Sequence, residues 1–206
     1  MAEASQIALP LSQALPPDPL RIVVGNANAR IIEILAEPSA WPFGTAILMG
    51  PPRSGKSLLA RWFAGKGLGT VVEGADRHDE TELFHRWNRA QESGEKLLLV
   101  ADGEGWDIAL PDLRSRLGAA QHLAIGTPDD AMVADLMVSH AARLGLVLGE
   151  DALTYLVPRT TRSFAGIEKL VATIDRLSLE RKLPPTLGIW RDALEAVHGP
   201  EQARLL

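Results

Sequence analysis

Eight residues from Gly50 to Ser57 form a pattern that binds phosphate groups. Their order, Gly-Pro-Pro-Arg-Ser-Gly-Lys-Ser, has the spacing of glycines, lysine and serine that defines a P-loop. Glycines let backbone N–H groups turn toward an anion, and a helix that begins here directs its positive end at the same point. Lys56 would neutralise phosphate oxygens, and Ser57 would bind Mg²⁺. The motif therefore predicts a site for a nucleoside di- or triphosphate with Mg²⁺.

The chain on both sides of this loop has the elements that a P-loop requires. The apolar run Thr45–Met49 predicts a buried parallel strand, and Ser57–Ala64 predicts the helix that follows. A glycine-rich turn that binds nothing is the alternative, but the complete motif between a strand and a helix favours a nucleotide site. The residues expected to contact the nucleotide here are Gly50, Pro51, Pro52, Arg53, Ser54, Gly55, Lys56 and Ser57.

Composition limits the classes of protein to which the chain can belong. Its 206 residues carry a formal net charge of −5, which disfavours a general nucleic-acid binder. It has no cysteine, which excludes disulfides, thiolate catalysis and Cys-based zinc sites, and its five histidines lack the spacing of metal ligands. No apolar run approaches the about 20 residues of a membrane span, and the N-terminus lacks a signal-peptide pattern. We expect a soluble cytoplasmic protein without a membrane partner.

Strands and helices alternate before Pro128, which indicates an α/β layer with a parallel sheet. Further strands are predicted at Val71–Val72, Leu97–Ala101 and Leu123–Ile125, and the most apolar of them, Leu97–Ala101, is expected at the centre. Helical periodicity predicts the remaining elements at Asn28–Leu35, Glu80–Gln91, Leu110–Leu117, Asp129–Leu144, Asp151–Val157, Ser163–Arg181 and Leu187–Val197.

These elements divide the chain into three expected parts. Residues 1–20 contain four prolines and read as an extended leader. Residues 21–127 would form the P-loop α/β domain. Residues 128–206 carry helices alone and would form a small helical lid domain.

Three further segments are similar to segments of one family of ATP-binding proteins. Val24-Gly25-Asn26-Ala27-Asn28 precedes the P-loop, Glu92-Ser93-Gly94-Glu95 precedes the Leu-rich strand, and Leu110-Pro111-Asp112-Leu113-Arg114-Ser115-Arg116-Leu117 follows it. In these segments, and in its P-loop domain and helical lid, the chain resembles the AAA+ ATPases from about residue 6 to residue 197. Among them it resembles the DnaA-related regulators of the Hda type. The resemblance implies an AAA+ P-loop NTPase domain followed by a small all-helical lid, with ADP or ATP and Mg²⁺ as ligands. The parallel sheet is expected to be shortened relative to the family.

The resemblance gives a role to two of these segments. Arg116 would be an arginine finger that acts in trans on a nucleotide held by a neighbouring protein, and such fingers raise rates by about 10³–10⁵. The alternative is that Arg114 and Arg116 pair with Asp112 or lie on a solvated helix face. The residues implied to line an adenine pocket are Val24, Gly25 and Asn26.

The order of elements in AAA+ chains assigns the remaining motifs. Because the arginine-finger helix follows the sensor 1 strand, Leu97–Ala101 would be sensor 1, and Thr70–Gly74 would be the Walker B strand. Glu73 then stands in place of the first Walker B acid and Gly74 in place of the second. Only about five residues separate the P-loop helix from this strand. We therefore expect that an edge strand and its helix are missing and that four strands remain.

The two groups that normally assist hydrolysis are thus weakened. The second Walker B acid is absent, and whether Asp76 compensates for it stays open. The sensor 2 arginine would fall near Ala165, and Arg162, one helical turn away, either replaces it or is a surface residue at the start of a helix. We expect the chain to bind nucleotide well and to have weak or no intrinsic ATPase activity.

The leader carries a separate motif. Gln6-Ile7-Ala8-Leu9-Pro10-Leu11 resembles the QxxLPL peptide by which Hda proteins bind the β sliding clamp of DNA polymerase III. Gln6 would make amide hydrogen bonds, Leu9 and Leu11 would enter an apolar cleft, and Pro10 would stiffen the segment. The alternative is that the leader packs on its own domain.

Taken together, the resemblance implies a negative regulator of chromosomal replication initiation. Bound to the clamp, it would present Arg116 to ATP on the initiator DnaA and stimulate hydrolysis there, with DNA reached only indirectly through the clamp. A stand-alone P-loop ATPase or small-molecule kinase is one alternative. Another is an adaptor that assists the assembly or loading of DnaA without activating hydrolysis. A homodimer, a mixed filament with DnaA and a monomer all stay open as oligomeric states.

Overall fold

A computed structural model describes residues 22–102 and 105–199 of the chain. The leader, with the predicted clamp-binding residues Gln6, Leu9, Pro10 and Leu11, lies outside the described residues. Within them, the strands are β1 (Thr45–Met49), β2 (Thr70–Glu73), β3 (Leu97–Val100) and β4 (Gln121–Ala124). The α-helices are α1 (Ala29–Ala36), α2 (Lys56–Gly65), α3 (Glu80–Ser93), α4 (Pro111–Gly118), α5 (Asp130–Arg143), α6 (Glu150–Leu156), α7 (Phe164–Arg181) and α8 (Leu187–His198). Short 3₁₀ turns are η1 (Pro38–Ala40), η2 (Pro42–Gly44), η3 (Ala75–Arg77) and η4 (Val157–Arg159).

The four described strands form one parallel sheet in the order β2-β3-β1-β4. Leu97 of β3 pairs with Thr45 of β1 on one side and with Thr70 of β2 on the other. All four residues of β3 are buried, as expected for a central parallel strand that is covered on both faces. The predicted α/β class, the short four-stranded sheet and the central place of the Leu-rich strand are confirmed.

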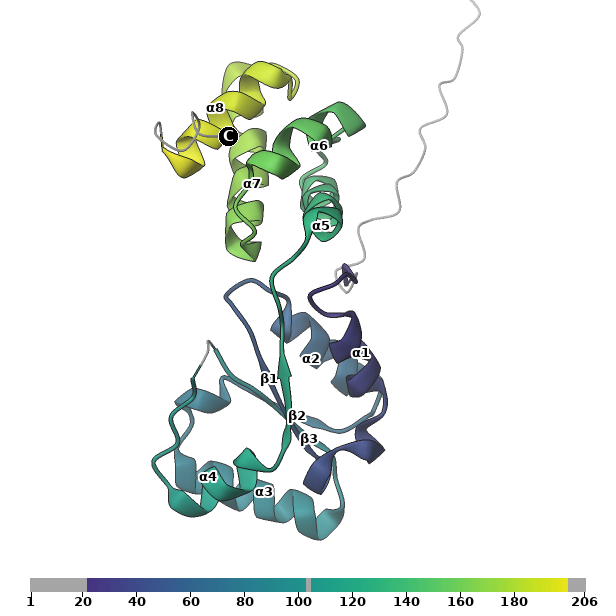
Figure 1. Ribbon diagram of the computed structural model, residues 1–206, viewed down its shortest axis with the longest axis vertical. Helices are drawn as coiled ribbons and strands as arrows, with labels where there is room; N and C mark the ends of the chain where they lie inside the picture. Colours follow the sequence, from purple (N-terminus) through teal and green to yellow (C-terminus); the bar gives the residue numbers. More distant parts are fainter. Residues whose placement is uncertain (1–21, 103–104, 200–206) are drawn as a thin grey trace, which may run out of the picture.

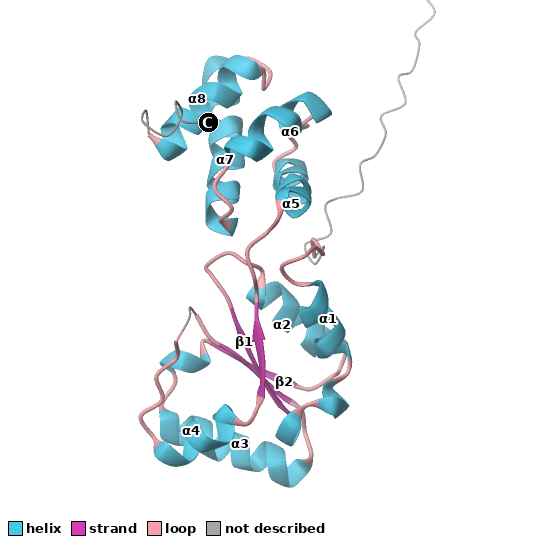
Figure 2. Ribbon diagram, in the orientation of Figure 1, coloured by secondary structure: helices cyan, strands magenta, loops and turns pink. Residues whose placement is uncertain are grey.

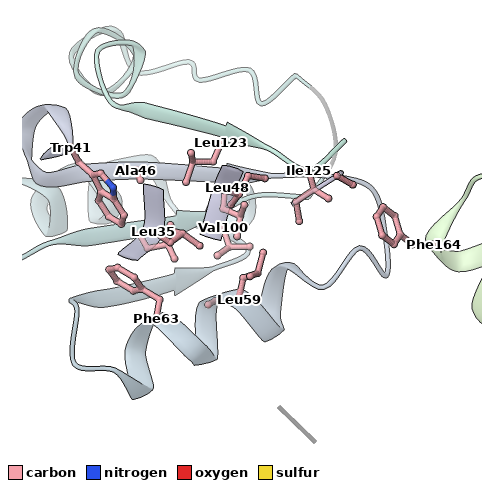
Figure 3. Close-up of a cluster of buried hydrophobic side chains, with 14 of the residues drawn as sticks. Leu35, Trp41, Ala46, Leu48, Leu59, Phe63, Val100, Leu123, Ile125 and Phe164 are labelled. Carbon is pink, nitrogen blue, oxygen red and sulfur yellow. The ribbon is translucent and has the colours of Figure 1, made fainter. Parts of the chain in front are cut away.

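Helices cover both faces of the sheet. Figure 1 shows α1 and α2 on one face and α3 and α4 on the other. Because alternate side chains of a strand point to opposite faces, Leu48 of β1 packs among residues of α1 and α2, whereas Ile47 packs with α3 and α4. On the first face, Trp41 stacks on Phe63 of α2 (Figure 3). The ring centroids are 5.3 Å apart. The two packed faces hold the strand ends, and the P-loop that follows β1, in fixed positions.

Helices α5 to α8 gather beyond the carboxyl ends of the strands, apart from the sheet (Figure 2). They share their own apolar core, in which Met137, Leu156, Leu170 and Ile174 are almost fully buried. Two of these helices begin at residues whose side chains accept hydrogen bonds from the first turn: the Asp129 carboxylate from the Met132 N–H at 2.9 Å, and the Ser163 hydroxyl from the Gly166 N–H at 3.4 Å. None of the described helices is both long and apolar enough to cross a membrane.

Two side chains of the helical part belong to the core of the sheet part. Phe164, the first residue of α7, is buried in the same cluster as Leu59 and Ile125 (Figure 3). Met132 of α5 belongs to this cluster as well. Apolar packing of this kind stabilises an interface roughly in proportion to the buried area. The starts of α5 and α7 are therefore held against the P-loop end of the sheet.

Candidate nucleotide-binding site

A cavity of about 500 Å³ lies between the P-loop and helices α5 and α7. Its polar side consists of the loop residues Pro52 to Ser57 together with Asp102. Its apolar side consists of Ile22, Val23, Met132, Leu136 and Phe164. A concave site with one apolar wall and a few convergent polar groups is the usual form of a small-molecule site.

The P-loop backbone adopts a conformation that glycine allows. Gly55 has a φ of +91°, in the left-handed region, and α2 begins at the next residue. Arg53 also has a positive φ of 65°, which is uncommon for a residue with a Cβ atom. At Gly50 a Cβ atom would lie 2.9 Å from the Cβ of Ile125, so a larger residue would push the loop away from the sheet. Close packing at Gly50 and the turn at Gly55 thus shape the loop.

One buried polar atom of the loop tests whether phosphate fits there. The hydroxyl oxygen of Ser54 is buried and has no hydrogen-bond partner among the described residues, although Ser54 lines the cavity. A buried polar group without a partner costs free energy, of order 1–3 kcal/mol. A phosphate oxygen in the loop would accept the missing hydrogen bond, so the residues present fit the ligand that the motif predicts.

Lys56 is 7% exposed, and its ammonium group is fully engaged. Its Nζ donates to the carbonyl oxygens of Gly50 at 2.8 Å and Pro51 at 3.1 Å, and it lies 3.2 Å from Oδ1 of Asp102. An ammonium group has three N–H donors, so each has an acceptor. Gly50 and Pro51 therefore act through their backbone carbonyls, and Asp102 supplies the negative charge beside Lys56.

Ser57 and Glu73 are brought together as the two motifs require. The Ser57 hydroxyl donates to Oε2 of Glu73 at 2.6 Å, which joins the first turn of α2 to the last residue of β2. Hydroxyl and carboxylate oxygens are the hard ligands that Mg²⁺ prefers. Gly74 follows with a φ of +64° and no side chain, while Oδ1 of Asp76 is buried without a hydrogen-bond partner in the described chain.

An ion pair joins the P-loop to the helical part. Nε and Nη2 of Arg53 donate to the two carboxylate oxygens of Glu168 on α7, a forked arrangement that is the strongest geometry for this pair. The hydrogen bond from Arg53 lowers the pKa of Glu168 below its ordinary value. Beside the pair, burial lowers the pKa of His140 on α5, so this histidine is neutral at pH 7. Arg162, the candidate for sensor 2, instead pairs with Asp130 at 2.8 Å.

The segment expected to line an adenine pocket lies at the mouth of the cavity. Ile22, Val23 and Asn28 line the cavity, while Val24 is 56% exposed. The Gly25 N–H donates to Oδ1 of Asn28 at 2.9 Å, and a Cβ at Gly25 would lie 2.8 Å from Met132. Asn26 donates to the Thr127 carbonyl and accepts from the Asp129 N–H, both at 2.9 Å. Asn26 therefore ties this segment to the start of α5, and its neighbours Ile22 and Val23 line the wall.

Arg116 lies on α4, on the opposite face of the sheet from α1 and α2. Its guanidinium stacks over two aromatic rings of α3, 4.9 Å from the centroid of Phe84 and 4.5 Å from that of Trp87. The Glu80 carboxylate accepts from the backbone N–H groups of Ala109 at 2.8 Å and Leu110 at 2.5 Å, which fastens the start of α4 to α3.

Arg114, also on α4, contacts residues that lie just before this helix. Its Nε donates to the Ile108 carbonyl at 2.7 Å, and its Nη2 lies 3.8 Å from Asp107. Arg116 thus stands on an aromatic surface, and Arg114 is tied to the chain just before the helix.

The polar residues of the site that were not singled out from the sequence include Asp102, His140, Arg143 and Glu168. Asp102 follows an apolar strand, and polar residues at the carboxyl ends of parallel strands border the ligand crevice in α/β folds, which is a signal that finds it. The other three stand on lid helices, where charged residues at helical spacing look like any solvated face.

Comparison with protein-family models gives no match, and comparison with curated protein sequences gives none either. Solved structures do match, at identities that show the fold alone. The fold is that of AAA+ P-loop ATPase domains, as found in DnaA and in RuvB. The expected AAA+ fold is thus confirmed, and the assignment to the Hda type stays a prediction.

Three of these structures illustrate the likeness. Domain III of the replication initiation protein DnaA from Thermotoga maritima has a TM-score of 0.72 and 14% identity, over 87% of this chain and 95% of that one. Replication initiator DnaA bound to AMPPCP and single-stranded DNA has a TM-score of 0.59 and 17% identity, over 78% of this chain and 66% of that one. The Holliday junction branch migration motor RuvB of Thermotoga maritima has a TM-score of 0.59 and 15% identity, over 85% of this chain and 72% of that one.

Proposed function

We propose that this chain is a nucleotide-binding AAA+ protein of chromosomal replication initiation that regulates DnaA negatively. The observation that carries the proposal is the convergence of Lys56, Ser57 and the unpartnered Ser54 hydroxyl at one end of a cavity in a DnaA-like fold. The likeness to a DnaA structure that is bound to AMPPCP supports a nucleotide as the ligand.

The ligand of this site is ADP or ATP with Mg²⁺. Phosphates would be held by the loop N–H groups, Ser54 and Lys56, and the metal ion by Ser57 with Glu73. The apolar wall that includes Val23, Met132 and Phe164 suits the faces of a base. Bound Mg²⁺ would supply charge neutralisation of the phosphates, and the chain's own residues position them.

The same site is poorly equipped to hydrolyse what it binds. Hydrolysis needs a residue that orients the attacking water, and Gly74 leaves the second acidic position without a side chain. The Glu73 carboxylate is engaged with Ser57, and Arg162 is paired with Asp130 at the start of α5. A P-loop that serves as a nucleotide-controlled joint, with weak or no intrinsic ATPase activity, fits these contacts.

Arg116 is the group that we propose to act on the ATP of a DnaA neighbour. The wall of its own chain's cavity comes from the P-loop, α2, α5 and α7, whereas α4 covers the other face of the sheet. Its guanidinium is half-buried over Phe84 and Trp87, a contact that orients a cation without neutralising it. An arginine so placed can stabilise the charge that develops on a neighbour's nucleotide.

Hydrolysis of ATP on DnaA tests the proposal. The protein and DNA-loaded clamp are added to ATP-bound DnaA, and phosphate release is followed. Wild type should accelerate release, Arg116→Ala should lose most of the acceleration, and Arg114→Ala should keep it. No acceleration by wild type, or full acceleration by Arg116→Ala, would sink the mechanism. Binding to DnaA without acceleration would favour an adaptor, and rapid turnover by the chain alone would favour a stand-alone ATPase.

Clamp binding is proposed from the sequence of the leader. A pull-down on immobilised clamp compares the full chain with a chain that lacks residues 1–12 and with the double variant Leu9→Ala/Leu11→Ala. Retention of the full chain alone supports the motif, since the two leucines are the side chains that would enter an apolar cleft. Equal retention of all three contradicts it.

A further inference from the structure

Asp102 lies between two cations at the end of the central strand. Its Oδ1 lies 3.2 Å from Lys56 Nζ, and its Oδ2 accepts from Nη1 of Arg77 at 2.6 Å. The hydrogen bonds from Lys56 and Arg77 lower the pKa of Asp102, so it is ionised at pH 7. The P-loop lysine is therefore paired with an anion of its own chain.

Gly74 makes room for the second cation. A Cβ atom at residue 74 would lie 2.6 Å from Nη2 of Arg77, closer than real Cβ atoms approach. Arg77 belongs to η3, directly after β2, and without a side chain at residue 74 its guanidinium can turn back toward β3 and reach Asp102. Gly74, which stands in place of the second Walker B acid, thus leaves the space that the Arg77 side chain occupies.

Phosphate binding must change this arrangement, because all three donors of Lys56 are in use. Lys56 can exchange Asp102 for a phosphate oxygen while it keeps its two loop carbonyls. Asp102 then stands beside the phosphates as a carboxylate, and like charges at short range repel. Arg77 offsets this repulsion by keeping the carboxylate in an ion pair.

We propose that the Asp102–Arg77 ion pair sets the preference of the cavity between nucleoside triphosphates and diphosphates, with Arg77 favouring the triphosphate. The inference rests on the proposed nucleotide binding. An unpaired Asp102 would repel the ligand with more phosphate charge more strongly, so Arg77 raises the affinity for triphosphate relative to diphosphate. Arg77 is 68% and Asp102 51% exposed on their side chains, so water screens the effect and limits its size.

Equilibrium binding of two ligands tests this pair. Fluorescent ADP and a non-hydrolysable fluorescent ATP analogue are titrated, with Mg²⁺, into the full-length wild type, Arg77→Ala, Asp102→Asn and the double variant. Arg77→Ala should weaken the analogue about fivefold and ADP by less than about twofold. Asp102→Asn should strengthen the analogue, and the double variant should bind it within about twofold of wild type, because the carboxylate that needs Arg77 is then absent.

Arg86→Ala is the matched control. It removes the same charge from an exposed position on α3, and both Kd values should stay within about twofold of wild type. Equal weakening of both ligands by Arg77→Ala, or a double variant as weak as Arg77→Ala, would overturn the inference while nucleotide binding stands. Wild type that binds neither ligand would overturn the proposed nucleotide site and this inference with it. Thermal unfolding of each variant checks that the fold is retained.

Discussion

The hydroxyl of Ser57 donates a 2.6 Å hydrogen bond to the carboxylate of Glu73. This contact joins two motifs that lie on different elements, the P-loop at the start of α2 and the acidic end of β2. The structure therefore holds a hydroxyl oxygen and a carboxylate oxygen from two separate motifs side by side at the P-loop end of the sheet.

The first prediction concerns the metal dependence of binding. Glu73→Gln keeps the shape of the side chain and removes its charge, so it should weaken the Mg²⁺-dependent part of nucleotide binding about tenfold. Binding in excess chelator should change little, because the loop N–H groups and Lys56 are untouched. Fluorescent-nucleotide titrations at a series of Mg²⁺ concentrations measure both quantities. Glu92→Gln, on an exposed position of α3, is the control, and an unchanged Mg²⁺ dependence in Glu73→Gln contradicts the assignment.

A second prediction concerns the ion pair between Arg53 and Glu168. Glu168→Gln removes the charge that ties α7 to the P-loop, so a bound nucleotide should dissociate about three- to fivefold faster. Asp192→Asn is the matched control, since it also removes one lid carboxylate that is paired with an arginine, Arg181. Stopped-flow displacement of fluorescent ADP measures the rate. If the two variants release ADP at the same rate, the pair does not hold the lid.

Stability should depend on pH through His140. Burial lowers the pKa of this histidine below 6.5, so the unfolded chain binds its proton more tightly than the folded chain does. The free energy of unfolding should therefore fall as pH drops below 6.5, and this part of the decline should end once folded His140 is protonated. Of the neighbouring charges, Glu168 raises the pKa of His140, whereas Arg143 and Arg53 lower it together with burial.

Urea unfolding at pH 7.5, 6.5 and 5.5 measures that decline. His140→Gln should make it shallower, whereas His85→Gln, at an exposed position, should leave it unchanged. Glu168 acts in a separate and more acidic range. Its lowered pKa means that its contribution is present above pH 4.5 and is lost as pH falls through the folded-state value. A variant His140→Gln with the wild-type slope contradicts the assignment to this histidine.

The packing between the two parts of the chain gives a fourth prediction. Phe164 is buried in the sheet-side cluster although it begins α7, so Phe164→Ala should cost about 3 kcal/mol of unfolding free energy. Leu187→Ala, at an exposed residue of the lid, should change stability by less than about 0.5 kcal/mol. Chemical denaturation measures both. Equal and small effects would show that the lid does not rely on Phe164 for its attachment.

The sequence predicts the elements of this fold well where an apolar run is bounded by a residue that ends a strand or helix, such as glycine. The strand expected at Thr45–Met49 is β1 as observed, because a fully apolar run ends at a P-loop glycine. The strand expected at Leu123–Ile125 is instead Gln121–Ala124. Its bounds follow the hydrogen-bonded register with β1, which begins at Ala46 opposite Gln121. Apolarity alone cannot predict a pairing that starts on polar residues.

Contacts between side chains that are far apart in the sequence could not be predicted from it. Arg53 and Glu168 stand 115 residues apart, and nothing in the spacing of α7 marks Glu168 as a partner of the P-loop. The apolar wall also begins just before the segment expected to line it: Ile22 and Val23 line the cavity, whereas Asn26 makes hydrogen bonds to Thr127 and Asp129. Motifs identify a ligand class, whereas the partners of each charge depend on how the helices pack.

Strand β2 is an edge strand of the described sheet, and its four residues are paired with β3 on one side only. The Glu73 carboxylate, which is expected to bind the metal ion, therefore belongs to a strand that is hydrogen-bonded to only one neighbouring strand. Edge strands are among the first elements to fray in local opening, ahead of global unfolding. Backbone amides of β2 should accordingly exchange with solvent faster than those of β3. Each local opening of β2 would separate Glu73 from Ser57. The rate at which a bound metal ion dissociates would then depend on how often this edge strand opens.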